Sequence, residues 1–140
     1  MRDAMANSVV GDDMYDDCPT TIKMQKDIAE VLGKEAALLV PSGCMANAIS
    51  MMTVAPSRGD CVVMGNQSHI MHYERGGMAS LGGVFPWTVK NNPDGTMPLK
   101  DIEYPIVNAV NEHIPPVTAI TLESSMNNCS GKVLRMDYIK

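Results

Sequence analysis

The sequence predicts an α/β fold in which helices flank a largely parallel sheet. Segments with apolar residues at helical spacing alternate along the chain with short apolar runs that are typical of strands. Glycine and proline stand between these segments, where turns are expected. The 140 residues are enough for one domain with a single core, and 45% of them are apolar, as is usual for globular proteins.

Four helices are expected. Thr20 or Thr21 can cap the first, and Gly33 fits its stop position. Pro105 weakens the last, because proline removes a backbone donor inside a helix. The expected helices span residues 20–32, 44–55, 69–80 and 99–110.

Four short strands are expected, the last of them buried. They span residues 36–40, 60–64, 84–89 and 117–122. In an open sheet of this kind, ligands collect where strands end and helices begin. Three segments follow strand ends and are therefore the expected sites of chemistry: residues 41–47, 65–69 and 123–131.

Composition and charge exclude some classes of partner. The net charge of −5 and the pI of about 5.0 provide no basic face for nucleic acid. The N-terminus lacks a signal-peptide pattern, and no apolar run reaches the roughly 20 residues of a membrane span. The four cysteines are widely spaced, as expected for reduced thiols. We therefore expect a soluble protein of the cytosol.

The turn that contains Ser42 and Gly43 is the first candidate binding segment. It joins a predicted strand to the start of a helix, where free backbone N–H groups and the helix dipole favour an anion. Gly43 lets the backbone approach a phosphate closely. The pattern also fits a plain capped turn, and neither GxGxxG nor GxxxxGK[ST] is present.

His69 is the second candidate, because it directly follows a predicted strand and turn. An imidazole there can stack on a planar ligand or act as an acid or base, although a structural histidine is the simpler alternative. Tyr73 lies one helical turn further and is expected on the same side. His72 adds only a weak two-histidine pattern, so no metal site is expected. Glu74 is expected to pair with Arg75 or a partner, or to be a solvated helix charge.

Five segments, taken in order, resemble the threonine aldolase family. MRDAMANSVVGDDMYDDCPT resembles the family's MRxAMxxAxVGDDVYGEDPT, and KEAALLVPSGCMANAIS resembles KEAALFVPSGTMGN. GDCVVMGNQSHIMHYERGG is similar to GDEVIxGDQSHIxxYExGG. NPDGTMPLKDIE and TLESSMNNCSGKVLRMDYI are similar to PDGTLDLxDIE and LENTHNxxGGxVLPLxY. The resemblance covers essentially the whole chain.

The resemblance implies that residues 1–140 are the N-terminal part of the large domain of a fold-type I, aspartate-aminotransferase-like enzyme. The implied cofactor is pyridoxal 5'-phosphate. The implied activity is that of a lyase that cleaves L-threonine or L-allo-threonine to glycine and acetaldehyde, in threonine catabolism and glycine biosynthesis. The implied assembly is a homotetramer, a dimer of dimers.

The same resemblance implies roles for individual residues. Ser42, Gly43 and Cys44 would hold the cofactor phosphate. His69 would stack on the pyridine ring and could serve as a base, and Tyr73 would line the substrate pocket. Three more residues would lie near the active site and the dimer contact: Asp12, Asp13 and Tyr15.

Three residues depart from the family pattern. Cys44 replaces a threonine, so a weak thiol donor stands where the family has a hydroxyl. Asp16 replaces a flexible glycine. Met126 replaces a histidine near the reacting group, and a thioether cannot transfer a proton. If that histidine is the family's base, aldolase activity is expected to be much reduced.

The family's Schiff-base lysine, its pyridine-binding aspartate and its substrate-binding arginine correspond to sequence beyond Lys140, as does the small C-terminal domain. We therefore expect a fragment or truncated chain that is inactive by itself and has an exposed sheet edge. Two alternatives remain open. The chain could be a non-catalytic oligomerisation partner of a full-length aldolase subunit, or the enzyme could act on another β-hydroxy amino acid.

Overall fold

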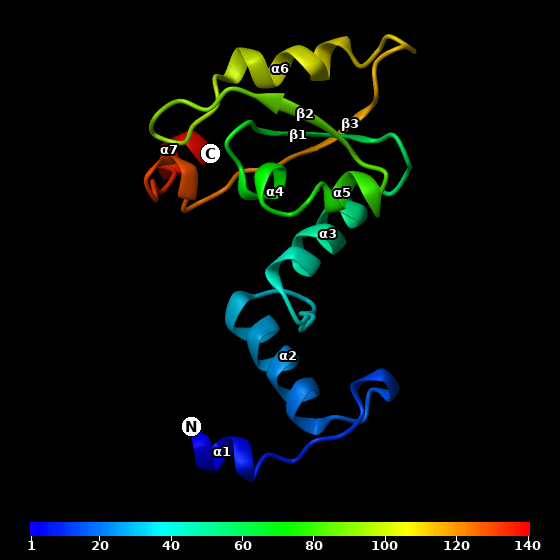
Figure 1. The fold of residues 1–140 in the computed structure, drawn as a ribbon, viewed down its shortest axis with the longest axis vertical. Helices are drawn as coiled ribbons and strands as arrows, with labels where there is room; N and C mark the ends of the chain where they lie inside the picture. The colour runs from blue at the N-terminus through cyan, green and yellow to red at the C-terminus, as the bar shows by residue number, and fades with distance from the viewer. The chain divides into compact units, whose positions relative to one another are not determined.

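The sheet is built around β1 (Cys61–Gly65), which pairs in parallel with β2 (Phe85–Val89) on one side and β3 (Val117–Ile120) on the other (Figure 1). All five residues of β1 are buried, as expected for a central parallel strand that is covered on both faces. Burial raises the pKa of the Cys61 thiol, which therefore fills the core as a neutral group. All four cysteines are free, as predicted.

Helices pack on both faces of this sheet. Val62 and Met64 point to one face and Val63 to the other, because side chains alternate along a strand. The first face is covered by α3 (Gly43–Val54) and the short helices that follow β1, and the second by α6. Two hydrophobic cores result. The first also contains Met51, Ala55, Ile70, Met78 and Val84, and the second Val89, Met97 and Ile102.

The computed structural model describes all 140 residues, which divide into two units, Met1–Pro41 and Ser42–Lys140. None of the helices has the length and apolar character needed to cross a membrane. The first unit contains α1 (Arg2–Ala6), the 3-10 turn η1 (Asp13–Tyr15) and α2 (Pro19–Leu32). Besides α3 and the three strands, the second contains α4 (His69–His72), α5 (Gly77–Ser80), α6 (Leu99–Asn108), the 3-10 turn η2 (Asn127–Cys129) and α7 (Met136–Ile139).

The helix predicted for residues 20–32 is present as α2. Pro19 begins it, because the fixed φ of proline suits the first helical position. The missing N–H costs nothing there, since the first N–H groups of a helix have no partner within the helix. The prediction of a cap at Thr20 or Thr21 is therefore wrong. Gly33 ends the helix in the left-handed region, at φ 62°, as predicted.

The strand predicted for residues 36–40 is absent, so the sheet has three strands rather than four. An apolar run becomes a strand only where a neighbouring strand can pair with its backbone. Here the N–H group of Leu39 instead donates to Oε1 of Gln25 at 2.8 Å, within the first unit.

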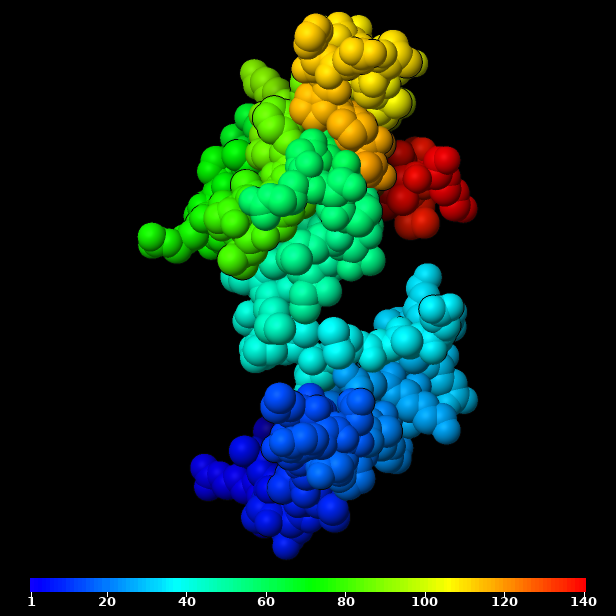
Figure 2. Space-filling model, turned by 90° about the vertical axis from the view of Figure 1, so that its right-hand side faces the viewer, coloured from blue at the N-terminus to red at the C-terminus, as the bar shows by residue number.

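β3 corresponds to the strand predicted for residues 117–122, but it is an edge strand and is not buried. Its residues alternate between half-buried and exposed, and Ile120 is 46% exposed. An edge strand has a neighbour on one side only, so fewer side chains cover it. Figure 2 shows this part of the chain, in orange, at the surface.

The predicted helix over residues 69–80 is broken into α4 and α5. Arg75 and Gly76 adopt left-handed conformations, with φ of 53° and 65°, and interrupt the helical backbone between them. Glycine takes this conformation without steric cost. The early end of α4 matters for the site, because the residues after His72 no longer follow a helical path.

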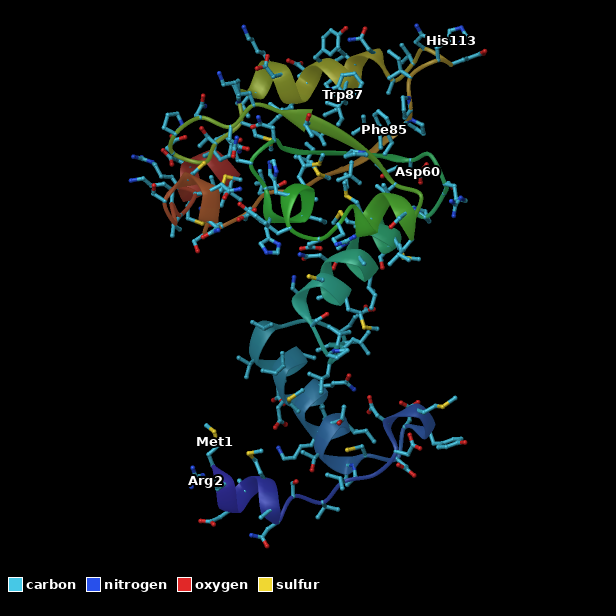
Figure 3. The ribbon with its side chains drawn as sticks, in the orientation of Figure 1. Met1, Arg2, Asp60, Phe85, Trp87 and His113 are labelled. Carbon is cyan, nitrogen blue, oxygen red and sulfur yellow. The ribbon has the colours of Figure 1, made fainter.

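The remaining predicted elements agree with the structure. α3 and β2 match the predicted ranges to within a residue, and α6 ends at Asn108 with Pro105 buried inside it. Trp87 on β2 lies beneath α6 in Figure 3, and its ring centroid is 6.1 Å from that of Tyr104 on the helix.

Asn91 joins the ends of β1 and β2. Its Oδ1 accepts from the N–H of Gln67 at 2.9 Å, and its Nδ2 donates to the carbonyl of Gly95 at 3.0 Å. Its own N–H donates to Oδ1 of Asn66 at 2.9 Å. The Asn91 amide fills the space beside Gly65, where a Cβ would lie 2.8 Å from the Asn91 Cγ.

Gly65→Ala is expected to destabilise the protein by about 1–3 kcal/mol, because the added methyl group displaces the Asn91 amide from its two hydrogen bonds. Urea unfolding of the whole protein that contains these residues measures this loss. In an Asn91→Ala background the same substitution should cost clearly less, since the overlap is gone. An equal loss in both backgrounds would contradict this explanation.

Candidate active site

The candidate site lies where the parallel strands end. The N–H of His69, after β1, donates to Oε2 of Glu123, after β3, at 2.6 Å. Oε1 of the same carboxylate accepts from the N–H of Asn127 at 3.1 Å. Glu123 therefore ties together two of the three segments in which the sequence predicted chemistry, residues 65–69 and 123–131.

A cavity of about 320 Å³ opens at this edge, within the size range of small-molecule sites. Its wall combines apolar side chains with a few polar groups that can orient a ligand. The third predicted segment reaches it only through Asn47, one turn inside α3. The lining residues are Asn47, Met51, Ser68, His69, Ile70, Thr121, Leu122 and Glu123.

A buried carboxylate holds the ring of His69. Its Nδ1 lies 2.9 Å from Oε1 of Glu74, whose side chain is only 5% exposed, against 47% for His69. The same Oε1 accepts from Nδ2 of Asn47 at 2.6 Å. Of the alternatives predicted for Glu74, pairing with a partner is therefore correct, and pairing with Arg75 or a solvated charge is wrong, because Glu74 lies beyond the end of α4.

Tyr73 lies on the same side as His69, as predicted, with ring centroids 5.3 Å apart. Its hydroxyl donates to Oδ1 of Asn128 at 3.0 Å, and Nδ2 of Asn128 donates to the carbonyl of Gln67 at 2.8 Å. These bonds hold the loop after β3 against the loop after β1. His72 makes a separate contact, with its Nε2 2.6 Å from the carbonyl oxygen of Asn66.

Ser42, Gly43 and Cys44 open α3 but do not line the cavity. Oγ of Ser42 caps the helix by accepting from the N–H of Met45 at 3.2 Å, and Cys44 is exposed. A Cβ added at Gly43 would meet no atom within 4 Å, so nothing in the fold requires glycine there. The first turn has room for a ligand at its free N–H groups.

The residues of the GDD-Y segment lie in the first unit. They form η1 and its cap and are exposed. Oδ1 of Asp12 accepts from the N–H of Met14 at 3.0 Å, which fixes the start of this 3-10 turn. Asp13 and Tyr15 are the other two members.

Met126 is 2% exposed and does not line the cavity. Its N–H donates to the carbonyl of Lys132 at 2.8 Å, and its Sδ lies 3.6 Å from where a Cβ on Gly95 would be. Its side chain therefore packs into the interior between these two turns.

Sequence reasoning missed three residues of the site: Asn47, Glu74 and Glu123. Two of them had a signal. Glu123 is the first charged residue after the apolar run 117–122, and Glu74 stands immediately before an Arg-Gly-Gly helix break. Asn47 carried no signal of its own, because its role depends on where Glu74 folds.

The fold is an α/β domain with a parallel sheet, and its cavity lies at the carboxyl ends of the strands, where sheets of this class bind ligands. A solved protein of Listeria monocytogenes EGD-E that is assigned as an L-allo-threonine aldolase has this fold, with a TM-score of 0.67 and 22% identity. The superposition covers 84% of this chain and 30% of that one. The fold is that of fold-type I pyridoxal-phosphate enzymes.

The chain belongs to the beta-eliminating lyase family, whose model matches residues 1–140. It is 46% identical over 140 residues to an Arabidopsis thaliana protein assigned as low-specificity L-threonine aldolase 2, covering 99% of this chain and 39% of that protein. It is 36% identical to the low specificity L-threonine aldolase of Escherichia coli K12, covering 100% and 40%. The chain thus spans about two fifths of these relatives. The family uses pyridoxal phosphate as its cofactor.

Met126→His is expected to lower the free energy of unfolding by about 1–3 kcal/mol, because a polar imidazole must be desolvated at a position where the native side chain is 2% exposed. Met126→Leu, which keeps the volume and apolar character, should cost less than about 1.5 kcal/mol. Urea unfolding of both variants in the whole protein measures the difference. Equal stability of the two would contradict the interior position of this side chain.

Proposed function

We propose that the protein containing these residues is a pyridoxal-phosphate-dependent lyase of threonine aldolase type. It would cleave L-threonine or L-allo-threonine to glycine and acetaldehyde. The observation that carries the proposal is the cavity at the strand ends, lined by His69 and Glu123 and reached by α3 through Asn47. Ser68, His69 and Ile70 in its wall belong to the QSHI motif, one of the specific motifs of the family resemblance.

The donor groups fit this cofactor. The first turn of α3 offers the N–H groups of Gly43 and Cys44 and the hydroxyl of Ser42, which suit a phosphate. Gly43 has open space where a Cβ would be. The imidazole of His69 provides a flat face for a pyridine ring, and its Nδ1 is already engaged by Glu74.

In the proposed reaction the cofactor supplies an electron sink for the negative charge that develops on Cα of the substrate. The chain's own residues bind and orient. The start of α3 binds the phosphate, and Glu123 fixes the backbone at His69. His69 contributes Nε2, which has no partner within the protein and is the atom that could take the proton of the β-hydroxyl group. Tyr73, whose ring lies beside that of His69, would line the substrate pocket.

The proposal extends to assembly and location. The protein would form a homotetramer in the cytosol, with the GDD-Y residues near the subunit contact and a role in threonine breakdown and glycine formation. Large apolar side chains are exposed within the first unit and need covering, by further chain of the whole protein or by another subunit. They include Val31, Leu32 and Leu38.

A second candidate is a non-catalytic subunit that pairs with a complete aldolase. Met126 favours it, because a buried thioether occupies the position where the family carries a histidine. A third candidate is a lyase that acts on another β-hydroxy amino acid, which the same cavity could also hold. Assays with different β-hydroxy amino acids distinguish it from the other two candidates.

The whole protein, purified with pyridoxal phosphate, is expected to release acetaldehyde and glycine from at least one of the two threonine isomers. Coupled detection of acetaldehyde measures this. Visible absorbance of bound cofactor without aldehyde from any β-hydroxy amino acid would contradict the aldolase proposal. Co-purification with a second, active subunit would then favour the non-catalytic role.

Gly43→Ala is expected to weaken pyridoxal phosphate binding about tenfold or more, equivalent to about 1.4 kcal/mol, because the methyl group occupies the space beside the phosphate. Stability of the cofactor-free protein should change by less than about 1 kcal/mol. Gly77→Ala is the matched control, since Gly77 also begins a helix and also has open space. Equal cofactor affinity in the two variants would contradict phosphate binding at α3.

A further inference from the structure

The two histidines of α4 contact groups that can only accept hydrogen bonds. Nδ1 of His69 lies 2.9 Å from the carboxylate of Glu74, and Nε2 of His72 lies 2.6 Å from the carbonyl oxygen of Asn66. An ionised carboxylate and a carbonyl have no proton to donate. Each contacting ring nitrogen must therefore carry the hydrogen, and the uncharged rings are held in opposite tautomers.

We propose that Glu74 is a positioning residue that fixes His69 as the Nδ1–H tautomer, with Asn47 holding the carboxylate in place. Nε2 of His69 is then left as a lone-pair acceptor, the form in which it can take a proton from a substrate hydroxyl group. The tautomer is a property of this chain, while its catalytic consequence rests on the proposed function.

Burial makes the Glu74 contact specific. The side chain of Glu74 is 5% exposed, so water competes little for its oxygens. Its Oε1 receives two donors, Nδ1 of His69 and Nδ2 of Asn47, the latter at 2.6 Å. Asn47 lies on α3 and lines the same cavity as His69. The carboxylate is thus held by one element and acts on a ring from another.

The broken helix makes this arrangement possible. In a continuous α-helix, residues five apart do not share a face, so Glu74 could not reach the ring of His69. α4 ends at His72, and Tyr73 leaves the helical conformation with φ −117° and ψ 5°, so Glu74 lies beyond the helix end. Glu123 meanwhile holds the backbone of His69 at 2.6 Å. One acidic residue fixes the backbone and the other fixes the ring.

The tautomers can be read directly from long-range ¹H–¹⁵N spectra of the whole protein with labelled histidine, at a pH where imidazoles are uncharged. His69, assigned by its loss in His69→Gln, should show a protonated Nδ1 and an unprotonated Nε2. His72 should show the reverse. A protonated Nε2 on wild-type His69 would overturn the proposal, whether or not the protein proves to be an aldolase.

Two substitutions at Glu74 separate positioning from packing. Glu74→Leu removes the acceptor, so His69 should lose the Nδ1–H tautomer and kcat should fall about 10²-fold with KM little changed. Glu74→Gln keeps Oε1 directed at both donors and should restore the tautomer and most of kcat. Retention of Nδ1–H in Glu74→Leu would overturn the proposal.

His72→Gln is the control on the same helix. It removes the other imidazole and should leave both the tautomer of His69 and the kinetics unchanged. If His72→Gln lowers kcat as much as Glu74→Leu does, the specific role of Glu74 is overturned.

Discussion

The parallel pairing of β1 with β2 and β3 is the constraint on which the rest of the second unit depends. Because all three strands run the same way, their carboxyl ends meet at one edge, and the loops that follow them come together there. β1 is buried on both faces, so its end cannot shift without disturbing both cores. The polar network of Asn91, Glu123 and Asn128 is built on that fixed edge.

Two glutamates at this edge act on one histidine by different routes. Glu123 uses both carboxylate oxygens on backbone N–H groups, so it sets where His69 begins its helix. Glu74 uses one oxygen on the ring itself. A ligand that meets His69 therefore encounters a side chain whose position and orientation are already fixed, which lowers the entropy lost on binding.

The sequence predicted the parts of this molecule that depend on local pattern. Helical spacing located α2, α3 and α6, and short apolar runs located the strands of the sheet. It failed where a partner distant in the chain decides the outcome. Residues 36–40 have the composition of a strand but no strand to pair with, and β3 is apolar yet lies at an edge.

The candidate site divides in the same way. The sequence predicted that His69 and Tyr73 face one side, because they are one helical turn apart. It could not predict the role of Glu74, because α4 ends at His72 and Glu74 lies outside the helix that the sequence predicted. Asn47 and Glu74 are 27 positions apart, and only the folded arrangement of α3 and the turn after α4 makes them neighbours.

Trp87 is the single tryptophan of the chain, and it lies between β2 and α6, close to Tyr104. Its intrinsic fluorescence is therefore a local signal of the α6 side of the sheet. An emission change on unfolding would follow the loss of that packing. Tryptophan fluorescence would not report on the helices of the first unit. Far-ultraviolet circular dichroism would detect their unfolding. Disagreement between the two optical signals would reveal that the units unfold separately.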